Sequence, residues 1–267
     1  MNAALNVFIF YLLHVALTAG LFCLFGVVIA ACNKLFYSSL GNKSRLVCYA
    51  TGFIGTPIHE LSHAFMCLVF VHKITEIKLF QINSADGVLG YVNHTYNPRN
   101  IYQRIGNFFI GIAPVLVGFL ILTGLFYLLL PEVFNACVGM IGAVNWTNGV
   151  GGFFGILTDL FGVLFDCFGM WQWWVFVIVG SFIALHMTLS KADWKGAFSG
   201  ILTFLIVFAV IDIIIALVSM DAMNAMTAGI MSFSVFVIYF GVIFIALILL
   251  LAILAAVIKR IIGMRYI

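Results

Sequence analysis

The sequence predicts an all-α polytopic membrane protein, with about six transmembrane helices and a small β-hairpin between the second and the third. Two observations support this fold class. Hydrophobic residues make up 65% of the 267 residues and charged residues only 8%, a composition that soluble globular domains do not have. Several apolar stretches also reach about 20 residues, the length that a helix needs to cross a bilayer. We expect one membrane-embedded domain over 1–267.

The first expected span contains one histidine, His14, for which we expect a hydrogen-bonded interior position. The first basic residue, Lys34, follows this span. A cleaved signal peptide has its basic residues before its apolar stretch, so we expect the first span to be a retained membrane anchor. The six expected spans are 7–31, 46–71, 105–130, 172–189, 196–219 and 230–258.

Residues 72–104 have a different pattern. Thr75–Gln81 alternates polar with apolar residues, Asn83–Gly87 has turn composition, and Val88–Tyr96 is a second strand-like run. This order predicts a β-hairpin from about Ile74 to Tyr96. A free edge of the hairpin could bind an extended peptide as an added strand. An ordinary loop at the membrane surface is the alternative interpretation.

Residues 131–172 form the longest weakly hydrophobic region. Within it, Gly155, Gly162 and Gly169 recur every seven residues. Small residues at regular spacing let helices approach closely. The pattern therefore indicates an interfacial or re-entrant segment, or a helix packed closely on a neighbour.

The most specific motif is His-Glu-x-x-His, formed by His59, Glu60 and His63 inside the second expected span. On a helix, two histidines four residues apart project from one face and can bind one zinc ion. Glu60 could then act as a base on the metal-bound water. Charged side chains in a span cost about 2 to 3 kcal/mol each, and zinc ligation would offset that cost. A polar cluster that neighbouring helices satisfy without a metal is the alternative.

Catalytic zinc usually has three protein ligands and a water. We choose Asp193 as the third ligand, because the expected topology places it in the same half of the membrane as the motif. An aspartate at a helix start is often a cap, and this alternative stays open. His186 is the substitute ligand, or a hydrogen-bond partner of a ligand. Other acidic residues are less well placed: Glu76, Glu132, Asp159, Asp166 and Asp212.

Over about 46–210 the chain resembles the site-2 protease class of intramembrane zinc metalloproteases. Three features carry the resemblance: the His-Glu-x-x-His motif inside a span, the hairpin-like segment after it, and an aspartate at a later helix start. The resemblance implies that Asp193 is a zinc ligand and that the hairpin presents substrate. Asn107, where the third span opens, is a further candidate for substrate binding. The chain departs from the family pattern at Trp194, where glycine is usual, and at Val117, which replaces an expected asparagine.

These residues predict a Zn²⁺ metalloprotease that hydrolyses peptide bonds in or near transmembrane segments, with single-span membrane proteins as substrates. One alternative is a proteolytically inactive, metal-binding membrane scaffold, which would have no chemical use for Glu60. The other is a metal transporter that uses His14, His59, His63 and His186. The chain has only nine acidic residues and six histidines, and they do not recur along several spans, which disfavours transport.

Charge gives the remaining expectations. The net charge of +3 is too small and too scattered to indicate a nucleic-acid partner. Basic residues favour the cytoplasmic side. They indicate that the C-terminus, the 190–195 turn and the hairpin lie in the cytoplasm, although the basic 32–45 turn disagrees. We expect a multi-pass protein of a bacterial cell membrane. The six cysteines form no Cys-x-x-Cys pair, and we interpret them as small hydrophobic residues. The sequence predicts no oligomeric state.

Overall fold

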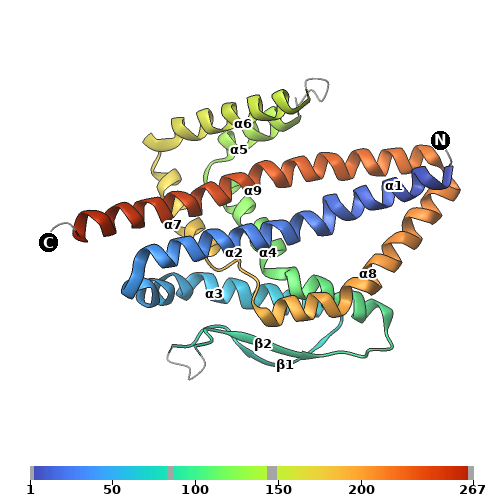
Figure 1. Ribbon diagram of the computed structural model, residues 1–267, viewed down its shortest axis with the longest axis horizontal. Helices are drawn as coiled ribbons and strands as arrows, with labels where there is room; N and C mark the ends of the chain where they lie inside the picture. The colour runs from blue at the N-terminus through green and yellow to red at the C-terminus, as the bar shows by residue number, and fades with distance from the viewer. Residues whose placement is uncertain (1–2, 83–86, 143–148, 264–267) are drawn as a thin grey trace.

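The computed structural model describes residues 3–82, 87–142 and 149–263, and these residues are almost all helical (Figure 1). One small antiparallel sheet, of β1 and β2, interrupts the helices. The elements are α1 (Ala3–Val15), a π-helical turn (Ala16–Gly20), α2 (Leu21–Leu40), α3 (Ser44–Val69), β1 (Lys73–Lys78), β2 (Tyr91–Thr95), α4 (Ile101–Leu129), α5 (Pro131–Gly142), α6 (Gly149–Asp166), α7 (Trp171–Ala184), α8 (Lys191–Val218) and α9 (Met220–Gly263).

Among the described residues, four helical stretches are long and apolar enough to cross a membrane, and a bent pair of helices could provide a fifth crossing. The first stretch, Leu5–Val69, includes both α2 and α3, which run in opposite directions on either side of Gly41 (Figure 1). Gly41 has a φ of 55°, a backbone conformation that glycine adopts at little cost. The elements agree with the predicted all-α polytopic membrane fold.

The fourth expected span, 172–189, is too long. In the structure α7 ends at Ala184, and the chain leaves the helix before α8 begins at Lys191. A helix of 14 residues rises about 21 Å, which is less than the roughly 30 Å of a hydrocarbon core. The helix before α7, Gly155–Gly169, is bent by 112° from it, so the pair is either a broken span or a re-entrant loop.

The region 131–172 contains α5 and α6, which pack on each other at one edge of the molecule (Figure 1). The close-packing interpretation of its glycine repeat is wrong. A Cβ atom added at Gly155, Gly162 or Gly169 would meet nothing within 4 Å. Part of the region, 143–148, lies outside the described residues.

The predicted β-hairpin is confirmed. Strand β1 pairs with β2, with Lys73 opposite Thr95 and Lys78 opposite Tyr91, and a bulge lies between Ile74 and Glu76. The hairpin lies along α3 and α8 on one side of the helices (Figure 1). Most of the predicted turn, 83–86, lies outside the described residues.

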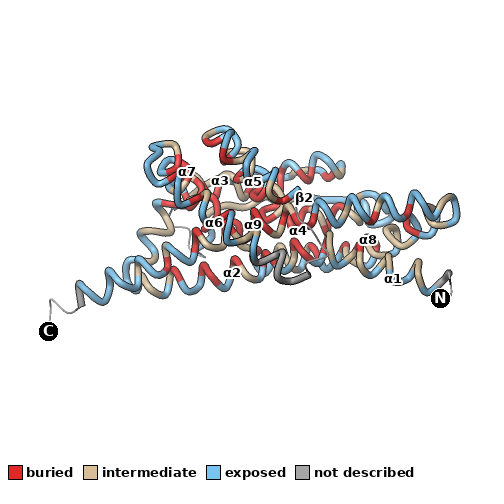
Figure 2. Tube along the Cα trace, turned by 90° about the horizontal axis from the view of Figure 1, so that it is seen from above, coloured by how far each residue is buried: buried red, intermediate tan, exposed pale blue. Residues whose placement is uncertain are grey.

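Helix α4 is at the centre of the structure and packs against both α3 and α8. Figure 2 shows that the buried residues gather in the middle of the molecule, around α3, α4 and α7, whereas the outer ends of α8 and α9 are exposed. Large apolar residues such as Leu128, Leu202 and Leu217 are exposed on the outer faces, as expected of helices that contact lipid. Because α4 separates α3 from α8, its packing determines how the motif and Asp193 approach each other.

Candidate metal centre

The motif lies in the second half of α3, which continues through Pro57 without a break. The four-residue spacing places the rings of His59 and His63 side by side, with centroids 4.9 Å apart. Their Nε2 atoms are 3.2 Å apart. Both side chains are mostly shielded from solvent, with exposed fractions of 15% and 10%. The expected shared face of the two histidines is therefore present.

Backbone carbonyls determine which ring nitrogens carry protons. Nδ1 of His59 lies 2.7 Å from the carbonyl oxygen of His186, and Nδ1 of His63 lies 2.8 Å from that of Ile110. A carbonyl oxygen can only accept, so each Nδ1 must donate and carries the proton of a neutral ring. Each Nε2 then has a lone pair, and the two lone pairs face each other. Such an arrangement requires a cation between them, either a metal ion or an added proton.

Asp193 supplies the third group. Its Oδ1 lies 3.2 Å from Nε2 of His63, and its Oδ2 lies 3.8 Å from Nε2 of His59. One atom from each of the three residues lies within 4.8 Å of the others, close enough for one metal ion. Asp193 also accepts a 2.6 Å hydrogen bond from the backbone N–H of Ser190, within a capping box. A carboxylate has two oxygens, so the cap and the ligand interpretations are compatible.

The close contact between α4 and α8 brings Asp193 to the motif. A Cβ atom added at Gly111 would lie 2.5 Å from the carbonyl oxygen of Asp193 and from the backbone nitrogen of Ala197. Any side chain there would push the first turn of α8 away from α4. Since Ile110, beside Gly111, accepts the hydrogen bond from His63, this contact aligns His63 with Asp193.

His186 is not among these three. Its ring nitrogens lie 3.0 Å from Oγ1 of Thr51 and 3.3 Å from Oγ1 of Thr56. Its contribution is the backbone carbonyl that accepts from His59. Of the two roles suggested by the sequence, the geometry favours the hydrogen-bond partner over the substitute ligand.

Glu60 and Asn107 line one cavity of about 580 Å³ together with His59, His63 and Asp193. Glu60 is 6% exposed, and within the described part of the chain no hydrogen bond or ion pair engages its carboxylate. Asn107 is also buried, and its Nδ2 donor has no hydrogen-bond partner among the residues described. The cavity thus combines a free acid and a free amide donor with the three candidate ligands.

The hairpin covers this cavity. Residues Gly90 to His94 line it, and a Cβ atom added at Gly90 would lie 2.8 Å from Cγ of Glu60. The chain just before β2 can run this close to the acid only because Gly90 has no side chain. The sequence therefore predicted the segment correctly, whereas its contact with Glu60 emerges only from the fold.

The other polar residues considered lie elsewhere. His14 is fully buried, with Nδ1 3.1 Å from Oδ2 of Asp212 and Nε2 2.9 Å from Oγ1 of Thr227. The expectation that His14 is a hydrogen-bonded interior group is confirmed. Asp159 and Asp166 are exposed on α6, and Glu76 accepts hydrogen bonds within the hairpin.

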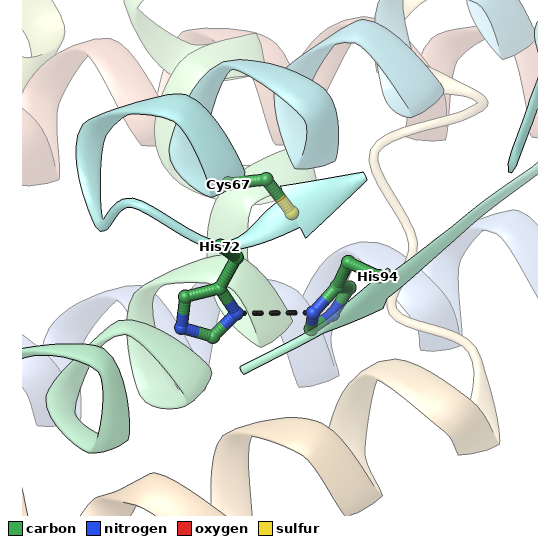
Figure 3. A group of neighbouring side chains, drawn as sticks. All are labelled: Cys67, His72 and His94. Carbon is green, nitrogen blue, oxygen red and sulfur yellow. Dashed lines mark hydrogen bonds between the residues drawn. The ribbon is translucent and has the colours of Figure 1, made fainter. Parts of the chain in front are cut away.

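Sequence reasoning missed a second cluster, formed by Cys67, His72 and His94 (Figure 3). One ligand atom from each lies within 4.8 Å of the others. Burial, followed by the electrostatic effects of His72 and His63, lowers the pKa of His94 to about 4. The ring is therefore neutral at physiological pH. The sequence offers one weak signal, Cys67 and His72 five residues apart, but His94 joins them only through the register of the hairpin.

Comparison with protein-family models, with curated proteins and with solved structures finds no match to this chain. The fold and the geometry define a helical membrane protein with two groups of side chains that could hold a metal ion. The function is therefore argued from these side chains.

Proposed function

We propose that the protein is an intramembrane zinc metalloprotease that hydrolyses peptide bonds in or near the transmembrane segments of membrane proteins. One observation carries the proposal. Two imidazole lone pairs and a carboxylate converge in an apolar helical protein, and the unengaged carboxylate of Glu60 lines the same cavity. A group of acceptors without a proton donor is stable there only with a cation.

His59, His63 and Asp193 would hold the Zn²⁺ ion. Two nitrogens and one carboxylate oxygen are a common ligand set for catalytic zinc, with one coordination position left for water. The Nδ1–H groups of both histidines donate to backbone carbonyls, which fixes the rings and makes Nε2 the better ligand atom. A zinc ion there would supply a Lewis acid and lower the pKa of a water molecule to about 7.

Glu60 would act as the general base and then as the general acid. Its carboxylate would take a proton from the attacking water and deliver it to the departing amine. Because no hydrogen bond within the described residues engages this carboxylate, it is free to make both transfers. General acid–base catalysis contributes roughly 10²- to 10⁴-fold to a rate.

The substrate would bind between β2 and α4. Within the described residues, β2 has only β1 as a strand neighbour, while Gly90 to His94 line the cavity. A membrane-protein segment that has unwound from its helix could pair with this edge as an added strand. Unwinding also exposes peptide carbonyls, and the amide of Asn107 could donate to one of them. Single-span membrane proteins with helix-weakening residues are the expected substrates.

The decisive experiment combines zinc analysis with cleavage of single-span membrane proteins by the purified protein. We expect Glu60→Gln to keep its bound zinc and lose cleavage by at least about 10²-fold. The control is Glu132→Gln, which changes an exposed glutamate on α5 and should alter neither property. His63→Ala should lose the zinc ion of this site together with cleavage.

Two results would contradict the proposal. Cleavage by Glu60→Gln at the wild-type rate would exclude the general-base role. Zinc-loaded wild-type protein that cleaves none of a broad panel of substrates would instead favour the inactive metal-binding scaffold. In both cases the zinc measurement would still test the ligand set separately from the chemistry.

A further inference from the structure

The cluster of Cys67, His72 and His94 brings together three separate segments (Figure 3). Cys67 is in the last turn of α3, His72 is in the connection to β1, and His94 is in β2. Cys67 is 0% exposed and His72 is 5% exposed. The three side chains point toward one another, at the end of α3 that faces the hairpin.

Hydrogen bonding fixes the protonation of His72. Its Nε2 lies 2.8 Å from the carbonyl oxygen of Gln103, so Nε2 carries the proton and Nδ1 has the lone pair. This Nδ1 lies 3.0 Å from Nδ1 of His94. The ring of His72 stacks on Tyr96, with centroids 5.1 Å apart and an interplanar angle of 12°. His72 therefore donates to a backbone carbonyl through one ring nitrogen and directs the other, which has the lone pair, at His94. Metal-ligating histidines are usually held by such a hydrogen bond.

An unusual backbone conformation places His72 there. Val71 has a φ of 58°, which is unfavourable for a β-branched residue. The turn lets the backbone N–H of His72 donate to the carbonyl oxygen of Cys67 at 2.8 Å. The side chain of Gln103 supports the same turn by donating to the carbonyl oxygen of Val71 at 2.7 Å. Strain of this kind is concentrated at binding and catalytic sites.

We propose that Cys67, His72 and His94 form a second metal site, which binds zinc and fixes β2 to the end of α3. A thiolate with two imidazoles is a ligand set that suits zinc. A buried thiolate also needs a positive neighbour, and a divalent ion would provide it. The site is distinct from the first, since it shares no residue with His59, His63 and Asp193.

The alternative is a hydrogen bond alone. Nδ1–H of His94 could donate to Nδ1 of His72, with Cys67 as a buried thiol. The two possibilities differ in metal content and in whether sulfur is a ligand. This inference does not depend on proteolysis, so it can fail or succeed independently of the proposed function.

The test uses Co²⁺ in place of zinc in the purified full-length protein. A cobalt–thiolate bond gives a near-ultraviolet charge-transfer absorption, and the first site has no sulfur ligand. We expect the wild-type protein to bind two ions per chain and to show this absorption. Cys67→Ser should bind one ion and lose the absorption. Cys137→Ser is the control, because Cys137 is also 0% exposed but lies on α5, and it should match the wild type.

Further variants separate the two sites. His63→Ala should lose one ion and keep the thiolate absorption, whereas His94→Asn should lose both one ion and the absorption. His94 is only partly buried, so this variant tests the site even if Cys67→Ser does not fold. The inference is overturned if the wild type shows no thiolate absorption, or if His94→Asn keeps both ions and the absorption.

Discussion

Asp193 has two tasks that can be separated by substitution. Its carboxylate faces His63 and also caps α8 through Ser190. Asp193 is the N3 residue of this capping box, and the amide oxygen of an asparagine there can still accept from the backbone N–H of Ser190 without carrying a charge. We expect Asp193→Asn to keep the start of α8 and to lower zinc affinity by at least about 10-fold. Loss of a residue that only hydrogen-bonds to a metal ligand already costs about that much.

The matched variant for this prediction is Ser190→Ala. It removes the hydroxyl that accepts from the backbone of Asp193 and leaves the carboxylate in place. It should cost about 1 kcal/mol of stability and keep zinc affinity close to that of the wild type. Zinc titration and thermal unfolding of both variants provide the measurement. Equal zinc affinity in Asp193→Asn and the wild type would mean that Asp193 is only a cap.

The histidines illustrate what a sequence can reveal about single residues. The shared face of His59 and His63 was predictable because the geometry of a helix turn is local. The carbonyls that fix their tautomers belong to Ile110 and His186, and backbone partners from distant segments leave no mark on the sequence. The proximity of Asp193 to these histidines was one of several possibilities, since the position of Asp193 depends on how α8 packs.

Among the helix contacts, that of α4 with α8 is the one that brings Asp193 to the site. Gly111→Ala would place a Cβ atom 2.5 Å from backbone atoms of α8. Overpacking of this kind costs about 1 to 3 kcal/mol. We therefore expect a lower midpoint of thermal unfolding and weaker zinc binding, because Asp193 must move.

Gly124→Ala is the control on the same helix. A Cβ atom there meets nothing within 4 Å, and alanine favours a helix over glycine by up to about 1 kcal/mol. This variant should unfold at the same or a higher temperature and bind zinc normally. If both variants behaved alike, close packing at Gly111 would not be what positions Asp193.

Among the helices and strands, features set by neighbouring residues were predictable, and features set by distant contacts were not. The hairpin was predictable from alternation and turn residues over a short stretch. The end of α7 at Ala184 was not, because apolar residues continue as far as Leu189. After Ala184 the chain makes tertiary hydrogen bonds instead, through the side chain and the carbonyl oxygen of His186. The second cluster was missed for a related reason, since it needs the turn at Val71 and the strand register together.

Across the whole molecule, metal binding should act as a cross-link. The first candidate site joins α3 to α8, and the second joins α3 to β2. A ligand that binds only the folded protein stabilises it, by about 2.7 kcal/mol at a concentration 100 times its dissociation constant. We expect a chelator to lower the unfolding temperature of the wild type in detergent. The double variant His63→Ala, Cys67→Ser should unfold at a temperature that the chelator does not change.

The short helix α7 has a consequence for the lipid around it. It packs against α3, and its 14 residues leave it about 9 Å shorter than an average hydrocarbon layer. Acyl chains next to a short membrane-crossing helix compress to match it. If the bent pair is a broken span, the bilayer should therefore dip beside α7 and draw headgroups down toward α3. Such a dimple would shorten the route by which water reaches His59 and His63 from the aqueous phase, a route that the proposed hydrolysis requires.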